Sequence, residues 1–265
     1  MLMGKLLDKI ATAWKYKREI ATHVFEIPYL YLRSSVELVE VPLDICINSF
    51  GFSYSRNGWH PVSALLKEIN ICDQRKNLED SVFYKFYERY RPENMGHLVR
   101  SFNSNVAFSP PVGILPWGGF AKKTLQSGGH ELKKTSWLCG PLDEHSIRLN
   151  IKRSVTLYNR MRNCGYNPWR INNSFIEGCF LVNKRGEKRF IIMHGKHRAA
   201  VLSFLGFEKI LARYAPESVR TIKETNVDDW FYVKTKQCSV QDALAYFHAY
   251  FKLTGAERAK ELGLL

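Results

Sequence analysis

The sequence predicts an α/β (α+β) fold, with a mixed sheet covered by helices. Three runs rich in apolar and β-branched residues, 175–182, 189–193 and 209–214, are typical of strands. A stretch with apolar residues at helical spacing, 146–164, precedes them, and a short apolar helix lies between the last two. Strands that alternate with helices favour a layered α/β architecture.

The first hundred residues predict an N-terminal α/β elaboration, 1–100. Residues 1–20 place apolar residues at helical spacing, which predicts a packed amphipathic helix; docking on a membrane surface is the alternative. Residues 36–42 alternate apolar and acidic side chains and indicate a half-buried strand. Pro61 suits the first turn of a helix, and the aromatic and basic stretch 84–91 reads as core, or as a surface that stacks bases or sugars.

Between residues 101 and 140 the composition shifts towards Ser, Pro and Gly. Such a stretch predicts a long irregular connection. A loop of this length is often a functional lid, so 101–140 is interpreted as a loop or lid over a neighbouring site.

The helix predicted over 146–164 has an apolar stripe and a basic remainder. Gly165 is expected to end it as the residue after the C-cap. The apolar positions are Ile147, Ile151, Val155 and Tyr158, and the basic ones are Arg148, Lys152, Arg153, Arg160 and Arg162.

The most specific local signal is the segment His194-Gly195-Lys196-His197-Arg198, which follows one predicted strand and opens a short apolar helix. A glycine at such a turn lets backbone N–H groups approach an anion closely, and the helix start adds its unsatisfied donors and positive dipole end. Lys196, His197 and Arg198 add charge and a bidentate fork. The segment therefore predicts a phosphate-binding turn, with a solvated tight turn as the alternative.

This segment and its surroundings resemble the nucleotide-binding core of the ParB/sulfiredoxin-like superfamily. Members carry a strand that ends in Asp-Gly-x-His-Arg, then a helix that ends in Leu-Gly, then another strand. Here the matching pieces are 189–193, the turn 194–198, a helix that ends at Leu205-Gly206, and 209–214. The resemblance covers about residues 143–214 and implies a ParB/sulfiredoxin-like core over 141–215.

Three activities occur in that superfamily: nucleotide-switched DNA clamps, sulfiredoxins that repair an oxidised cysteine, and kinases that phosphorylate free serine. A sulfiredoxin needs a cysteine where this chain has Lys196, so repair is not expected. The kinases carry a glutamate at the start of the helix before the core strands, and Glu144 stands there. The resemblance thus implies Glu144 as general base, with His145 and Arg148 as possible substrate contacts; a first-turn acidic residue favoured by the helix dipole is the alternative for Glu144.

The chain departs from the superfamily pattern at His194, where members carry aspartate. Magnesium prefers oxygen ligands, so the loss of this carboxylate weakens a direct metal role at that position. Either Asp143 or Glu177 compensates, or the chain only binds its anion; no metal ligand is assigned.

Residues 216–265 are expected to form a C-terminal strand and helix packed on the core. Ser239 and Asp242 give a Ser-x-x-Asp helix start, and an apolar stripe follows. The stretch 220–236 reads as extended, and too few residues remain for the helix-turn-helix domain of partitioning ParB proteins.

Composition and cysteine spacing limit the kinds of ligand, metal site and cellular location that the sequence predicts. The 39 Lys and Arg against 25 Asp and Glu give a net charge of +14, which attracts nucleotides and nucleic acids alike. The six cysteines include no C-x-x-C pair, so a zinc ribbon or disulfide scaffold is not expected and the reducing cytoplasm is the expected location. No apolar run reaches about 18 residues, so no transmembrane segment is expected.

Together these observations predict a kinase that uses a nucleoside triphosphate, ATP or CTP with Mg²⁺, to phosphorylate a small hydroxyl-bearing acceptor such as a sugar or amino acid. The alternative is a ParB-like nucleic-acid-binding or nuclease-like protein that applies the same turn to a phosphodiester backbone. A scaffold without catalysis is the third reading.

Overall fold

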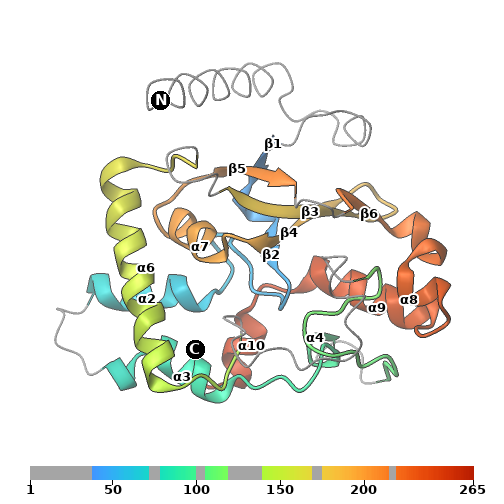
Figure 1. Ribbon diagram of the computed structural model, residues 1–265, viewed down its shortest axis with the longest axis horizontal. Helices are drawn as coiled ribbons and strands as arrows, with labels where there is room; N and C mark the ends of the chain where they lie inside the picture. The colour runs from blue at the N-terminus through green and yellow to red at the C-terminus, as the bar shows by residue number, and fades with distance from the viewer. Residues whose placement is uncertain (1–37, 72–77, 100–104, 119–138, 169–174, 215–218) are drawn as a thin grey trace, which may run out of the picture.

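The computed structural model describes residues 38–71, 78–99, 105–118, 139–168, 175–214 and 219–265 (Figure 1). Within these residues six strands form one sheet, in the order β1-β5-β3-β4-β2, with β6 also paired to β3. The strands are β1 (Leu38–Pro42), β2 (Cys46–Asn48), β3 (Ile176–Val182), β4 (Lys188–His194), β5 (Lys209–Tyr214) and β6 (Thr221–Lys223).

The sheet is mixed. β1 pairs with β5 and β3 pairs with β4 in antiparallel fashion, while β2 with β4, β3 with β5 and β3 with β6 are parallel. The predicted α/β class, a mixed sheet with helices, is therefore confirmed.

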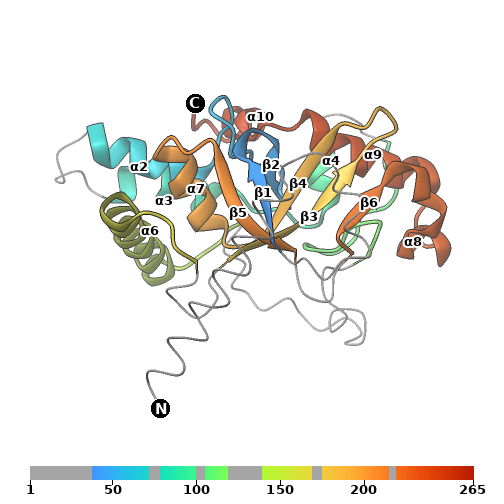
Figure 2. The same ribbon diagram turned by 90° about the horizontal axis from the view of Figure 1, so that it is seen from above.

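Helices pack on both sides of this sheet. In Figure 2 the strands run through the middle, with α2, α3, α6 and α7 on one side and α8 and α9 on the other. The helices are α2 (Pro61–Ile71), α3 (Val82–Arg89), α4 (Gly96–Val99), α6 (Glu144–Cys164), α7 (Lys196–Phe204), α8 (Phe231–Lys234), α9 (Val240–Lys252) and α10 (Ala256–Glu261), and 3₁₀ turns cover η2 (Leu43–Ile45), η3 (Leu78–Asp80) and η4 (Glu224–Asp229).

Strand β4 is the strand that carries the predicted turn, and it is buried on both faces. Its consecutive residues Phe190, Ile191, Ile192 and Met193 are all buried. Successive side chains of a strand point to opposite faces, so both faces of β4 are covered. The continuous apolar run before His194 follows from this position, and its burial fixes the point at which the turn begins.

The sheet crosses the predicted domain boundaries. β1 and β2 lie within residues 1–100, yet β1 pairs with β5 and β2 pairs with β4 of the predicted 141–215 core. The boundaries at residues 100 and 141 therefore separate strands that share one sheet.

Several predicted elements match the structure closely. The helix expected over 146–164 is α6, which spans Glu144–Cys164, and Gly165 follows as its C-cap with a φ of 69° rather than as the residue after the C-cap. Pro61 opens α2, and the strand expected over 209–214 is β5. The predicted helix 1–20 lies outside the described residues.

The structure also bears on the predictions for residues 84–91 and 220–236. Phe86 and Tyr87 of the aromatic stretch 84–91 are buried, so these two rings belong to the core. The prediction that 220–236 is extended is wrong beyond β6, because η4 and α8 fold most of it into helical turns.

The described part of the predicted lid, 105–118, is irregular and packs against α8 and α9. The Phe108 amide donates to Asp242 at 3.0 Å, and the Tyr246 hydroxyl donates to the Phe108 carbonyl at 2.6 Å. The Tyr232 amide donates to the Pro116 carbonyl at 3.0 Å. Residues 119–138 of this segment lie outside the described residues.

Candidate functional site: the turn between β4 and α7

The predicted turn has the strand–glycine–helix geometry that the sequence indicates. β4 ends at His194, Gly195 adopts a left-handed φ of 80°, and α7 begins at Lys196. A Cβ on Gly195 would lie 3.0 Å from Nη2 of Arg198 and 3.1 Å from Cα of Ile176. Both the backbone conformation and the close approach therefore require glycine here.

The first turn of α7 presents donors and no side-chain cap. Gly195 is the N-cap residue, and its lack of a side chain leaves the helix start without a side-chain capping hydrogen bond. The first N–H groups of a helix have no acceptor within the helix, and the helix dipole places partial positive charge beside them. Strand β2, which runs parallel to β4, also ends close to the turn. Its last residue, Asn48, pairs with Ile192, two residues before the end of β4.

The side chains that follow Gly195 meet different neighbours. Nδ1 of His197 lies 3.5 Å from Oγ of Ser154 in α6. Arg198 lies near Glu177 and Tyr166, which both act on its pKa. Lys196 and His197 act in turn on the pKa of His60, the residue before α2.

Lys196, His197 and His60 form a partly desolvated basic cluster. Burial lowers the pKa of Lys196 to about 8. Burial lowers the pKa of His197 to about 4, and the charges of Arg153 and Lys196 add to the effect. Burial lowers the pKa of His60 to about 3, with contributions from His197 and Lys196. At neutral pH both histidines are uncharged, because burial disfavours their protonated forms and the charge of Lys196 repels an added proton.

His60 is held in place from two sides. Its Nδ1 accepts a hydrogen bond from the Val62 amide at 3.2 Å, and its ring stacks on Tyr54 with centroids 4.8 Å apart. Since Nδ1 accepts, the ring proton of the neutral form sits on Nε2. His60 also lines a cavity of about 490 Å³, together with Trp59, Ser63, Lys67 and Ser203.

Arg198 belongs to a second charged group on the β3 side of the turn. Burial lowers the pKa of Arg198, and Tyr166 and Glu177 act in the opposite direction. Glu177 pairs with Arg213, and the guanidinium of Arg213 lies 5.8 Å from the centre of the Phe175 ring. The Glu177 carboxylate thus pairs with Arg213 and also acts electrostatically on Arg198.

Helix α6 turns polar side chains towards the interior beside His197. Ser154 and Asn150 are both fully buried. The Ser154 hydroxyl donates to the Asn150 carbonyl at 2.8 Å, and the Asn150 amide group donates to the Ser146 carbonyl at 3.0 Å. Oδ1 of Asn150 is buried without a hydrogen bond from any described residue. Such a buried acceptor is costly unless a ligand or water supplies a donor.

The sequence prediction missed His60, Asn150 and Ser154. The signal for the last two was present, because both polar residues stand on the same side of α6 as Ile147, Ile151 and Tyr158. His60 carried no comparable signal, since its neighbours at the turn lie more than 130 residues along the chain.

The predicted base Glu144 does not lie at the turn. It is ten residues before Ser154 on the same helix, and this corresponds to about 15 Å along the helix axis. Its exposed carboxylate accepts from Nε of Arg148 at 2.7 Å. The carboxylate of Glu79 lies 3.9 Å from the same guanidinium.

The other predicted positions also have defined surroundings. His145 is exposed on the first turn of α6. Asp143 caps that helix by accepting from the Ser146 amide at 2.8 Å and the Ser146 hydroxyl at 2.7 Å, and these bonds lower its pKa. His194 is exposed and pairs in register with Glu177. Of the two carboxylates expected to compensate for His194, Glu177 is thus the one beside the turn.

Among the described residues, no group of three or more His, Cys, Asp or Glu side chains is arranged to hold a metal ion. Cys46, Cys139, Cys164, Cys179 and Cys238 are free thiols. None of the helices in the described ranges is both long enough and apolar enough to span a bilayer. Comparison of the chain with protein-family models, curated proteins and solved structures finds no match in any of the three.

Proposed function

We propose that this protein binds the phosphate groups of a nucleoside triphosphate at the β4–α7 turn and transfers one phosphoryl group to a small hydroxyl-bearing acceptor. The observation that carries the proposal is the pair of cationic side chains Lys196 and Arg198 at a helix start whose N-cap is a left-handed glycine, with the neutral histidines His197 and His60 beside them. A ParB/sulfiredoxin-like core is part of the same proposal, on the resemblance of residues 143–214.

Charge favours an anionic ligand at this turn. Within the described part of the chain, no carboxylate forms an ion pair with Lys196, and burial already depresses the pKa of its ammonium group. Lys196 is partly buried. A partly desolvated charge without a partner is unfavourable, and a phosphate group beside it would reduce that cost. Arg198 adds a planar fork suited to phosphate oxygens.

The cavity beside His60 is a suitable place for the acceptor. Its volume of about 490 Å³ falls in the range of small-molecule sites. Ser63 and Ser203 supply hydroxyl groups, and Trp59 supplies an apolar surface. Of the residues that line the cavity, His60 is one whose pKa is affected by Lys196 and His197 of the turn.

Phosphoryl transfer needs positioned charge more than it needs a strong base. Its transition state is loose, so most of the catalysis comes from orientation and from cations around the transferred group. The proposal therefore assigns charge stabilisation to Lys196 and Arg198. It assigns no base role to Glu144, whose carboxylate is paired with Arg148. As the new P–O bond forms, the β–γ phosphoanhydride bond breaks, the nucleoside diphosphate leaves and the proton of the acceptor hydroxyl passes to solvent.

Mg²⁺ is the expected companion of a nucleoside triphosphate, but the described residues do not fit a protein-held magnesium site. Glu177 is the carboxylate beside the turn, and it is already paired with Arg213. No step of the proposal depends on Mg²⁺ held by these side chains.

The direct test is nucleoside diphosphate release from ATP or CTP in the presence of sugars and free amino acids as acceptors. Arg198→Gln should lower the rate about 100-fold, as expected for loss of a group that stabilises transition-state charge. Glu144→Gln should leave the rate within about threefold of wild type, which is within the effect of an exposed ion pair. Arg185→Gln, an exposed change on the β3–β4 turn, is the matched control. No acceptor-dependent release by wild type, or full activity in Arg198→Gln, contradicts the proposal.

A further inference from the structure

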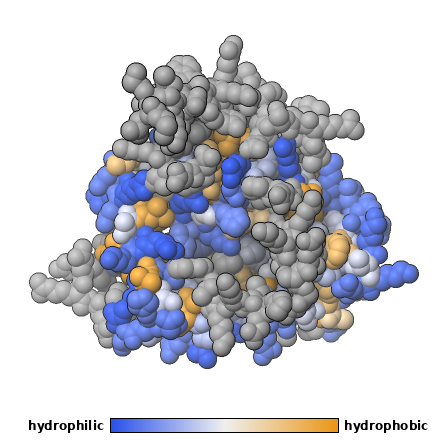
Figure 3. Space-filling model, viewed as in Figure 1, coloured by the Kyte–Doolittle hydropathy of each residue, from blue (hydrophilic) through white to orange (hydrophobic). Residues whose placement is uncertain are grey.

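Helix α6 carries a basic face that the proposed function does not use. The face consists of Arg148, Lys152, Arg153, Arg160 and Arg162, all exposed. In Figure 1 α6 lies along one flank of the molecule, and in the space-filling view of the same side hydrophilic atoms predominate over this flank (Figure 3).

The opposite side of α6 is packed into the molecule. Ile147, Ile151, Tyr158 and Met161 are buried at helical spacing. The basic side chains therefore stand on the side of the helix that the fold leaves uncovered.

Acidic side chains do not balance this face. Glu144 is the one acidic residue among the 21 of α6, and it pairs with Arg148. Within the described ranges, no carboxylate forms an ion pair with Lys152, Arg160 or Arg162. Arg148 and Lys152 stand four residues apart, a like-charge spacing that destabilises a helix slightly. Lys152, Arg160 and Arg162 therefore gain no stabilising ion pair within the described residues, and a binding role accounts for their charges.

We infer that the basic face of α6 binds the phosphate backbone of a nucleic acid. The helix is about 30 Å long, and each strand of B-DNA carries one phosphate per ~3.4 Å of helix axis. Several phosphates can thus lie along the face at once. Thr156, Asn159 and Asn163 are exposed between the charges and offer neutral hydrogen-bonding groups of the kind that contact phosphate and sugar.

Other anionic partners fit this face less well. A membrane-bound helix buries an apolar side in the lipid, but the apolar side of α6 is already packed in the core. A protein interface relies on buried aromatic or aliphatic anchors, and Leu149, 47% exposed, is the one large exposed hydrophobic residue among the described residues of α6. Backbone phosphates require charge alone, which is what the face offers.

The test is a fluorescence-anisotropy titration of a labelled 24-base-pair DNA duplex, and of the single strand, at salt concentrations from about 50 to 200 mM. The variant Lys152→Gln/Arg160→Gln/Arg162→Gln changes only exposed residues outside the turn. The control Arg185→Gln/Lys236→Gln/Lys260→Gln removes the same charge from exposed positions elsewhere. Circular dichroism of both variants verifies that α6 is folded.

The α6 variant should bind the duplex at least tenfold more weakly than the control. The slope of log affinity against log salt should fall by about 2.7, that is, about 0.9 for each of three lost phosphate contacts. Equal affinities of the two variants, or no binding by wild type at the lowest salt, would overturn the inference. Calorimetry with ATP on the same α6 variant keeps this result separate from the turn, since Lys196, His197 and Arg198 are unchanged.

Discussion

Gly195 fixes the turn at the scale of a single residue. Gly195→Ala places a Cβ in the left-handed region at a φ of 80° and within 3.1 Å of Ile176. We expect a loss of unfolding free energy of about 2 kcal/mol or more, measured by urea denaturation. Gly186→Ala is the matched control, because it has the same φ of 80° but nothing within 4 Å of the added Cβ. Gly186→Ala should lose less unfolding free energy than Gly195→Ala, because its added Cβ meets no neighbouring atoms. Equal losses in the two variants would show that the close packing around Gly195 is unimportant.

Buried His60 and partly buried His197 make stability sensitive to acid. The pKa values of His60 and His197, about 3 and about 4, lie below the usual value of 6.5. The unfolded chain therefore binds more protons below pH 6.5, and stability falls as the pH drops through 6.5 towards these values. At pH 5 each histidine should cost about 2 kcal/mol relative to pH 7.5.

The variant His60→Asn tests this, because its Oδ1 can still accept from the Val62 amide. We expect the unfolding free energy of this variant to fall less than that of wild type between pH 7.5 and 5. Urea denaturation at each pH measures it. A slope equal to that of wild type would contradict the burial of a neutral His60.

The residues of the turn were predictable because their signal is local. A strand, a glycine and a basic helix start follow one another within 194–198. His60 and Ser154 were not predictable as partners of this turn. They reach it through the packing of α2 and α6, which sequence spacing alone does not reveal.

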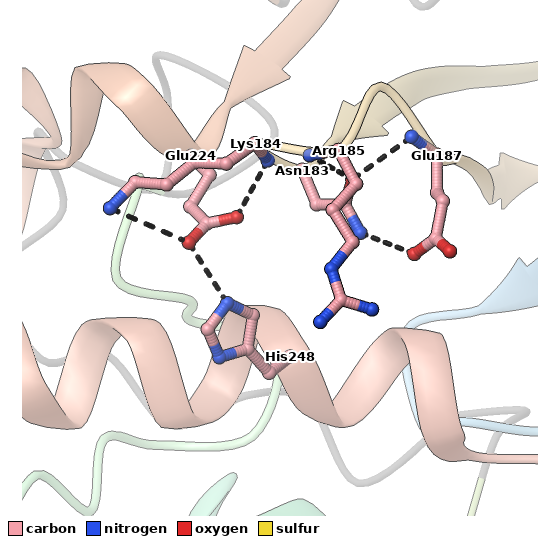
Figure 4. Close-up of polar contacts among 6 residues, drawn as sticks. All are labelled: Asn183, Lys184, Arg185, Glu187, Glu224 and His248. Atoms are coloured by element: carbon pink, nitrogen blue, oxygen red, sulfur yellow. Dashed lines mark hydrogen bonds and ion pairs between the residues drawn. The ribbon is translucent and has the colours of Figure 1, made fainter.

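At the scale of elements, Glu224 joins three parts of the fold (Figure 4). Its carboxylate accepts from the Lys184 amide at 2.8 Å in the turn between β3 and β4, and Nε2 of His248 in α9 lies 3.1 Å away. Burial raises the pKa of Glu224, but the hydrogen bonds from Lys184 and His248 and their charges outweigh burial, so the pKa lies below its usual value.

Glu224→Gln should lower the unfolding free energy at pH 7 by about 2 kcal/mol, the scale of a hydrogen bond to a charged group. The contribution is present above the unfolded pKa of about 4.5 and is lost as the pH falls through the lower folded value, so the difference from wild type should shrink in acid. Thermal and urea denaturation measure it. Glu187→Gln, an exposed change in the same turn, should cost less than ~1 kcal/mol; a similar cost for both variants would refute the role of Glu224.

A long helix with a regular apolar stripe was predicted well from the sequence, whereas a short helix rich in aromatic residues was not. The 21 residues of α6 show their apolar stripe directly. The stretch around Trp230 and Tyr232 has strand-like composition, but α8 forms there because Trp230 packs on Phe247 with centroids 5.3 Å apart and Tyr232 on Phe108 with centroids 5.5 Å apart. Tertiary contacts outweigh local propensity in such short segments.

At the scale of the whole molecule, the strand order could not be read from the sequence. Composition suggested a boundary near residue 100, but Val39 pairs with Ala212 and Ile47 pairs with Ile191 across that boundary. Pairings between strands more than 140 residues apart leave no local pattern. The fold class was predictable because it depends only on which elements are present.

Lys196 makes ligand binding depend on pH. The pKa of this residue is about 8 in the protein without ligand, and the phosphate site needs its charged form. Affinity for ATP should therefore be nearly constant from pH 6.5 to 7.5 and fall up to tenfold per pH unit above about 8. Calorimetry from pH 6.5 to 9.5 measures this. Lys196→Arg keeps its charge over this range and should bind with little dependence on pH; the same decline in both proteins would rule out Lys196 as its cause.

The most direct test of the phosphate-binding turn is calorimetric titration of ATP and of CTP, with and without Mg²⁺, into wild type, Arg198→Ala and the exposed control Arg185→Ala. We predict saturable binding to wild type and to Arg185→Ala. Binding to the folded Arg198→Ala variant should be at least tenfold weaker, as expected for loss of a charged hydrogen bond to phosphate. Absence of binding to wild type, or unchanged binding to Arg198→Ala, would contradict a phosphate site at this turn.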